Sequence, residues 1–294
     1  MKKIVCLFCL ILILFISSCS SSVSESNASD ANPENLDDYL SSFAYTSGED
    51  STARDESLII SQSQNSSKLS IEDAYNKYKS ALDSFSGLSS LNANSETVIL
   101  VSGVAEFNIT YRMSAAKDNG KIFMRSQTTN ILYDSNSQLS DYVFSEKYSD
   151  GENTFNQIST NSSKETTSEA GGAGIEDLMS YISSFDSSKI INIDTSTDNG
   201  GQKLIFTLDP SSVKENIESI IDSLNYEDIR MTAYAVTAYV NNDGYLTSES
   251  TSVSFDYITD YKVYTGTANT YTQISDINSK MSIDVPEWLE SQNN

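Results

Sequence analysis

A period of two in the side chains from Ile99 to Met113 limits the folds open to this chain. Every odd position there is apolar or small, whereas Asn108, Thr110 and Arg112 occupy even positions. A period of two is typical of a strand with one buried face. We therefore predict one long strand over residues 96–113, bent at Gly103, in a sheet that is buried on one side.

Further strand-like segments follow, separated by turns rich in Asn, Asp and Gly. Asn119-Gly120 is a strong hairpin signal, because both residues tolerate positive φ angles. The other predicted strands are residues 121–133, 141–149, 153–160, 189–193, 204–208, 228–240, 245–259 and 261–278, and a short one that Pro286 ends. This succession predicts an antiparallel meander.

Three segments have the 3.6-residue period of amphipathic helices. They are residues 71–85, residues 175–185 and a helix that follows Asp209-Pro210. Ser70 is placed to cap the first helix together with Asp73, and Ser212 with Glu215 predicts a capping box for the third. Residues 161–174 contain no aliphatic side chain larger than alanine, and we predict a mobile loop or a lid there.

The first nineteen residues predict an exported, lipid-anchored protein. Lys2 and Lys3 precede an apolar run of thirteen residues, Ile4–Ile16, shorter than the ~20 residues that span a bilayer. Ile16-Ser17-Ser18-Cys19 resembles the bacterial lipoprotein box, whose cysteine receives diacylglycerol. The resemblance implies a signal peptide over residues 1–18 and a membrane anchor at Cys19. An ordinary secretory signal with an incidental cysteine is the alternative.

Residues 19–68 predict a disordered tether rather than part of the fold. They hold nine acidic residues against Arg54 and Lys68, with few aliphatic side chains. Such a segment cannot bury enough apolar surface to offset the entropy lost on ordering. We therefore expect a lipidated cysteine, an acidic tether, and a single folded domain over residues 69–294.

Composition excludes several classes of function. The chain has 41 acidic against 18 basic residues, a formal charge of −23, and this charge repels nucleic-acid phosphates. The three cysteines, Cys6, Cys9 and Cys19, all precede the folded domain, so no disulfide is expected in it. Histidine, the commonest general base and metal ligand, is absent. No spacing singles out a nucleophile or a carboxylate pair, so we predict no catalytic residue, metal or cofactor.

The predicted strand over residues 229–240 has apolar side chains on both faces, which indicates a central strand covered on both sides. Its small Ala233 and Ala235 either leave room for an apolar ligand or let a helix approach closely. Together with apolar residues of two other strands they form a candidate ligand site. Its members are Phe107, Ile109, Tyr111, Met231, Ala233, Ala235, Phe255 and Tyr257.

The layout of the chain resembles the LolA/LolB-like lipoproteins over about residues 69–289. The shared features are the lipoprotein box, the tether, the first helix, the meander with a helix after Asp209-Pro210, and the terminal segment Tyr271 to Ile283-Asp284-Val285-Pro286-Glu287. The resemblance implies an α+β fold, a curved antiparallel half-barrel clasping two or three helices, whose apolar concavity holds acyl chains in better-known relatives.

We therefore expect a monomeric lipoprotein at the extracytoplasmic face of the cell membrane. It would bind a hydrophobic ligand, an acyl chain or a lipid, without catalysis. The alternative is a surface interaction module that binds a protein or glycan partner and has no cavity.

Overall fold

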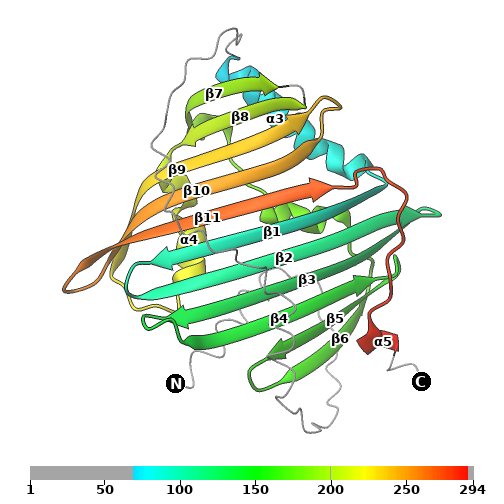
Figure 1. Cartoon of the computed structure of the whole chain (residues 1–294), viewed down its shortest axis with the longest axis horizontal. Coiled ribbons are helices and arrows are strands. Elements are labelled where there is room, and N and C mark those ends of the chain that lie inside the picture. The colour runs from blue at the N-terminus through cyan, green and yellow to red at the C-terminus, as the bar shows by residue number, and fades with distance from the viewer. Residues whose placement is uncertain (1–68, 199, 291–294) are drawn as a thin grey trace, which may run out of the picture. The chain divides into compact units, whose positions relative to one another are not determined.

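The computed structural model describes residues 69–198 and 200–290. The predicted signal peptide, Cys19 and the tether lie outside the described residues. Eleven strands of the described part form one antiparallel sheet in the order β6-β5-β4-β3-β2-β1-β11-β10-β9-β8-β7 (Figure 1). Their bounds are β1 Ser90–Val101, β2 Ala105–Asp118, β3 Lys121–Asp134, β4 Leu139–Ser149, β5 Asn153–Thr160, β6 Lys164–Ala170, β7 Ile190–Asp198, β8 Gly201–Leu208, β9 Asp228–Asn241, β10 Leu246–Ile258 and β11 Val263–Ser275.

The sheet consists of two meanders joined edge to edge. Strands β1 to β6 form one and β7 to β11 the other, and β1 pairs with β11 at the junction, where Val98 lies opposite Asn269. The predicted α+β class and antiparallel meander are confirmed. The edge strands β6 and β7 do not pair with each other, and the sheet is open and uncurled. The fold therefore matches the predicted class but not the half-barrel.

The strand predicted over residues 96–113 is two strands, β1 and β2. They are joined by a tight turn in which Gly103 has a φ of 71° and the Val104 N–H donates to the Val101 carbonyl at 2.9 Å. Val101 pairs directly with Ala105, so odd-numbered residues share one face on both sides of the turn. The alternation therefore continues through the turn, and periodicity alone cannot reveal the break.

Helical segments pack on one face of the sheet, which we call the inner face, and the opposite one the outer face. The segments are α3 Ile71–Asp83, η2 Ser84–Gly87, η3 Ile175–Tyr181, η4 Ser187–Lys189, η5 Pro210–Val213 and α4 Lys214–Ile221. The short helix α5 Glu287–Glu290, near the C-terminus, is not one of them. Tyr78 of α3, Leu178 of η3 and Ile217 of α4 belong to one buried core with side chains of the sheet, such as Phe206 and Phe255. Helices α3 and α4 lie behind the strands in Figure 1.

The observed N-terminal cap agrees with the predicted one at α3 but differs from it at α4. The Asp73 N–H donates to Ser70 Oγ at 3.1 Å, which confirms the predicted cap of α3. The capping box of Ser212 and Glu215 is wrong, because the 3-10 turn η5 precedes α4. There the Ser211 N–H donates to Asp209 Oδ1 at 3.0 Å, so Asp209 caps the segment.

Three local predictions need correction. The loop or lid predicted over residues 161–174 contains β6, an edge strand paired to β5, and all of its side chains are exposed. A strand exposed on both faces has no apolar alternation by which to recognise it. The helix predicted over residues 175–185 is the 3-10 helix η3, which ends at Tyr181. The short strand before Pro286 is not formed.

Gly266 of β11 makes room for the ring of Phe255, its partner on β10. A Cβ atom at position 266 would overlap three atoms of that ring, and Phe255 is only 1% exposed. We expect Gly266→Ala to lower the free energy of unfolding by about 1–3 kcal/mol, the usual cost of overpacking a core. Urea unfolding followed by circular dichroism measures the change. Gly87→Ala, whose Cβ would meet no atom within 4 Å, is the control; equal stability of both variants would contradict the prediction.

Candidate functional site

The predicted ligand residues divide between the two faces of the sheet. Four of them, Phe107, Tyr111, Phe255 and Tyr257, belong to the core of the inner face and are 1–3% exposed. Ile109 lies on the same face of β2 and is half-buried, as is Met231 of β9. Ala233 is exposed and Ala235 half-buried, and both lie opposite outer-face serines of β10. The structure therefore does not bring all eight residues together.

A β-bulge in β9 explains this division. Met231 pairs with Phe255 and Ala233 pairs with Ser254, so Thr232 is left over between them. One extra residue shifts the alternation to the other face. Apolar residues before and after the bulge consequently share the inner face, and Ala233 is directed outward. The prediction that this strand is covered on both sides is wrong.

Residues 175–183, which we call the inner strap, cross the inner face of the sheet. Asp177 forms an ion pair with Lys147 of β4 at 2.9 Å. The Tyr181 ring stacks on that of Tyr111 of β2, with 3.7 Å between the centroids. Thr272 of β11 donates from Oγ1 to the Tyr181 carbonyl at 3.1 Å. The inner strap thus spans strands of both meanders and covers one of the predicted ligand residues.

The end of the inner strap is held by a buried carboxyl group. The Ser183 N–H donates to Glu249 Oε1 at 2.7 Å, and the Tyr78 hydroxyl lies within hydrogen-bond distance of both Glu249 Oε2 and the Ser183 carbonyl. Burial raises the pKa of Glu249 above its ordinary value, although the bonds from Tyr78 and Ser183 act in the opposite direction. Glu249 therefore joins β10, α3 and the inner strap in one polar cluster.

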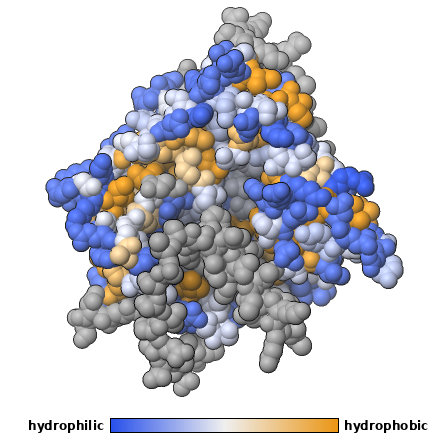
Figure 2. Space-filling view, turned by 180° about the vertical axis from the view of Figure 1, so that it is seen from behind, coloured by the Kyte–Doolittle hydropathy of each residue, from blue (hydrophilic) through white to orange (hydrophobic). Residues whose placement is uncertain are grey.

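The part of the helix-bearing side that is not covered by grey atoms in Figure 2 displays several patches of apolar residues. Figure 2 shows these patches divided by hydrophilic residues. The broad apolar face of the sheet is covered by α3, α4 and the inner strap, since core residues such as Leu204, Phe206 and Ile229 have no exposed surface. No helix of the described residues is long and apolar enough to cross a membrane.

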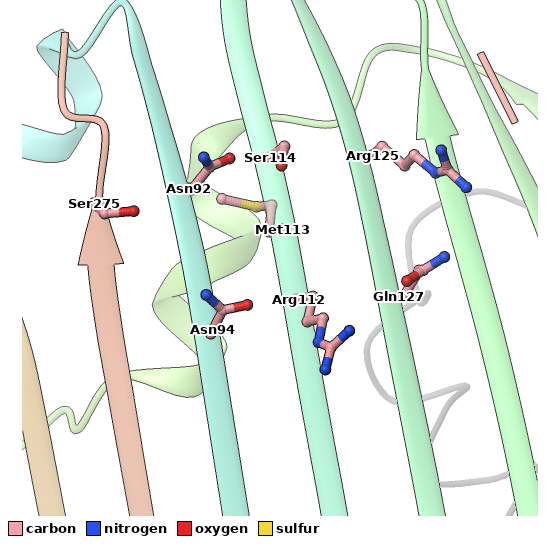
Figure 3. Close-up of a pocket in the computed structure, with 8 residues that line it drawn as sticks. All are labelled: Asn92, Asn94, Arg112, Met113, Ser114, Arg125, Gln127 and Ser275. Atoms are coloured by element: carbon pink, nitrogen blue, oxygen red, sulfur yellow. The ribbon is translucent and has the colours of Figure 1, made fainter. Parts of the chain in front are cut away.

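A pocket of about 460 Å³ lies on the outer face, where sequence reasoning placed no site. Its polar lining comes from two adjacent rows of paired residues on β11, β1, β2 and β3 (Figure 3). The first row is Ser275, Asn92, Ser114 and Arg125, and the second is Asn94, Arg112 and Gln127. The lining contains two guanidinium groups and no carboxylate. We call it the outer pocket.

A buried glutamate fixes the orientation of one pocket arginine. Arg125 donates from Nε and Nη2 to Glu146 Oε1, both at 2.7 Å, and Gln127 donates to the same oxygen at 2.9 Å. The indole N–H of Trp288 donates to Glu146 Oε2 at 2.7 Å. The segment that follows β11 runs beside the ends of neighbouring strands and brings α5, with Trp288, to this point (Figure 1). The outer pocket is therefore bordered by a firmly positioned ion pair.

Comparisons with known proteins identify no family. No protein-family model matches the chain, and no curated protein matches it. Several solved structures are similar to the chain at low levels. Rv2717c from M. tuberculosis is 11% identical, over 66% of this chain and 97% of that one, with a TM-score of 0.20.

The second structure is the LolA superfamily protein NE2245 from Nitrosomonas europaea, which is 10% identical over 74% of this chain and 96% of its own, with a TM-score of 0.20. The third is a beta-barrel-like protein of the domain of unknown function DUF1849 from Brucella abortus, 12% identical over 64% and 99%, with a TM-score of 0.15. A LolA superfamily protein is thus among the structural neighbours, at low identity and low TM-score.

Proposed function

We propose that the chain is a lipoprotein, anchored through Cys19 at the extracytoplasmic face of the cell membrane, that binds a hydrophobic ligand without catalysis. The ligand is an acyl chain or a lipid, and the protein acts as a monomer. The proposed site is the inner face of the sheet beneath the inner strap. Curvature of the sheet around the ligand would form the half-barrel that the LolA/LolB-like resemblance implies.

The observation that supports this site most is the stacking of Tyr181 on Tyr111. The ring of Tyr181 belongs to a short 3-10 helix, a conformation with poorer hydrogen-bond geometry than an α-helix, and it covers Tyr111 on the apolar face. A ligand chain in the place of the Tyr181 ring would contact the same face. In this proposal the inner strap and the ligand compete for one surface.

Mass spectrometry of the protein purified from membranes tests the anchor and the ligand separately. Under denaturing conditions, we expect the mature N-terminal peptide to carry diacylglycerol on Cys19. Under native conditions, we expect an additional, non-covalent mass that organic extraction removes. An unmodified Cys19 would refute the anchor, and a native mass without any extractable lipid would count against the ligand.

Weakening the inner strap should increase ligand binding. We expect Tyr181→Ala to bind a fluorescent C16 fatty acid several-fold more tightly than the wild type, because the variant no longer has to displace the Tyr181 ring. Tyr271→Ala, at a tyrosine of β11 that is 52% exposed, is the matched control and should bind as the wild type does. Far-ultraviolet circular dichroism verifies folding. Equal, weak binding by all three proteins would contradict a site under the inner strap.

The surface interaction module is the second candidate, and the close packing of the inner face favours it. Phe255 and Tyr257 are 1% and 2% exposed, and the Tyr257 hydroxyl donates to the Asn225 carbonyl at 2.6 Å. Part of the predicted ligand site is thus filled by the protein itself. Recovery of one stoichiometric protein or glycan partner from membranes, unchanged by lipid depletion, would favour this function over lipid binding.

A further inference from the structure

A buried carboxyl group without a cation lies at the point where the inner strap ends. Glu249 of β10 is 3% exposed, and no lysine or arginine of the described residues forms an ion pair with it. Burial without an opposite charge favours the protonated form of an acid, because ionisation would place a charge where water does not reach. This effect outweighs the bonds that Tyr78 and Ser183 donate, so the pKa of Glu249 is raised.

The inner strap covers one oxygen of this carboxyl group. The Ser183 N–H donates to Glu249 Oε1 at 2.7 Å, and the Ser183 hydroxyl lies 2.7 Å from the hydroxyl of Thr251 on the same strand. The side chain of Ile182 beside it is 6% exposed. Strand β10 is held by ladders to β9 and β11, so it cannot move away from the strap. Lifting residues 181–183 would therefore break these contacts and open Glu249 Oε1 to water.

The two ends of the inner strap are held by different kinds of contact. At the first end, Asp177 forms its ion pair with Lys147, and the two side chains are 30% and 34% exposed. Two opposite charges in contact with water hold that end. At the second end, Ser183 contacts a buried acid that has no cation. A proton lost in this region consequently acts on the Ser183 end of the strap.

Tyrosines are the other titratable groups near this acid. They are Tyr75 and Tyr78 of α3, Tyr181 of the inner strap and Tyr234 of β9. Tyrosine hydroxyls titrate near pH 10, and burial raises the pKa of Tyr78 and of Tyr234. Between pH 4 and pH 8 these hydroxyls keep their protons, so a change of charge in this cluster belongs to Glu249.

We propose that Glu249 is a pH switch of the inner strap, in which the protonated acid keeps residues 181–183 on the sheet and loss of the proton releases them. The sign follows from linkage: the acid holds its proton more tightly under the strap than in water, so each proton lost favours the open strap. Opening would take the Tyr181 ring off Tyr111. As a control of ligand entry, the switch rests on the proposed hydrophobic site of the inner face.

Hydrogen exchange of the full chain, followed by mass spectrometry from pH 5 to pH 8, measures strap opening without a ligand. In the wild type, we expect the protection factor of residues 175–183 to fall at least tenfold more than that of β2. Glu249→Gln cannot ionise, so its strap should keep the same protection relative to β2 at every pH. Glu146→Gln changes another buried glutamate, which pairs with Arg125, and should behave as the wild type does.

Two outcomes of the exchange experiment would overturn the switch. An equal fall in the inner strap and in β2 would show that the whole fold loosens instead of the strap. An equal fall in the wild type and in Glu249→Gln would show that another group titrates.

Binding of a fluorescent C16 fatty acid at pH 5 and pH 8 tests the control of ligand entry. We expect the affinity to rise several-fold more in the wild type than in Glu249→Gln, and the titration of the fatty acid itself is common to both proteins. A strap that opens with pH in a protein that binds no fatty acid would support the switch and refute the proposed ligand. Fatty-acid binding by a protein whose strap protection does not change with pH would overturn the switch and leave the proposed ligand standing.

Discussion

Replacing Tyr78 by alanine is expected to lower the free energy of unfolding by about 3–5 kcal/mol, the range for aromatic residues removed from a core. Tyr78 joins α3 to the sheet and is 1% exposed. Its ring stacks on Phe185 at 5.2 Å between centroids and lies 5.6 Å from the ring of Phe206 on β8. A strand held by ladders on both sides cannot move to fill the cavity, so most of the cavity cost remains. Urea unfolding measures the loss.

Two further variants separate the ring of Tyr78 from its hydroxyl group. Tyr78→Phe keeps the packing and removes one buried hydrogen-bonding group, so we expect a loss of about 1–2 kcal/mol. Tyr261→Ala removes a ring that is 94% exposed, and its stability should stay within about 0.5 kcal/mol of the wild type. If Tyr78→Ala were no less stable than Tyr261→Ala, α3 would not be packed on the sheet as described.

Half of the outer pocket could be derived from the sequence, and the other half could not. The turn Asn119-Gly120 was predicted, and a two-residue hairpin sets Asp118 opposite Lys121. Counting outward from that pair places Arg112 and Arg125 one row apart on neighbouring strands. Asn92 and Ser275 join them only because β1 pairs with β11. No local pattern specifies a pairing between segments so far apart in the chain.

The inner face shows the same limit of local reasoning. Periodicity predicted the helix α3 and most of the strands, since both patterns depend on neighbours in sequence. The bulge at Thr232 could not be recognised from the sequence pattern. A strand whose alternation shifts by one residue has the same pattern as a strand that is apolar on both faces. The inner strap was predicted as a helix, yet its shape is decided by tertiary contacts, such as the Tyr181 stack on Tyr111 and the bond from Ser183 to Glu249.

Replacing Glu249 by alanine is expected to lower the free energy of unfolding by about 2–4 kcal/mol at pH 5. The change leaves the Ser183 N–H without its acceptor and opens a cavity at a residue that is 3% exposed. Glu249→Gln should lose far less, because its amide oxygen accepts from Ser183 and its amide nitrogen donates to the Tyr78 oxygen. Urea unfolding of both variants at one pH measures the difference, and equal losses would contradict a specific role of the hydrogen bonds.

Burial favours the protonated form of Glu249 in the folded protein. The Tyr78 hydroxyl has one proton but two oxygen neighbours, Glu249 Oε2 and the Ser183 carbonyl. Tyr78 is the donor to Glu249 Oε2, and this bond acts to lower the pKa of the carboxyl group. Burial outweighs this bond, so the pKa of Glu249 is raised above its ordinary value. The carboxyl group therefore carries its proton to a higher pH when the protein is folded than when it is unfolded.

Stability should consequently fall with rising pH in the wild type more than in Glu249→Gln. Because the pKa of Glu249 is raised on folding, its contribution to stability is complete below the unfolded pKa, about 4.3, and is lost as the pH rises through the folded value. Each tenfold difference in proton affinity corresponds to about 1.4 kcal/mol.

Acids whose pKa is lowered on folding, such as Asp134 and Asp209, act in the opposite direction but are common to both proteins. The difference between the two unfolding free energies, measured from pH 4 to pH 8, thus isolates Glu249; a difference that does not change with pH would show that Glu249 titrates alike in both states.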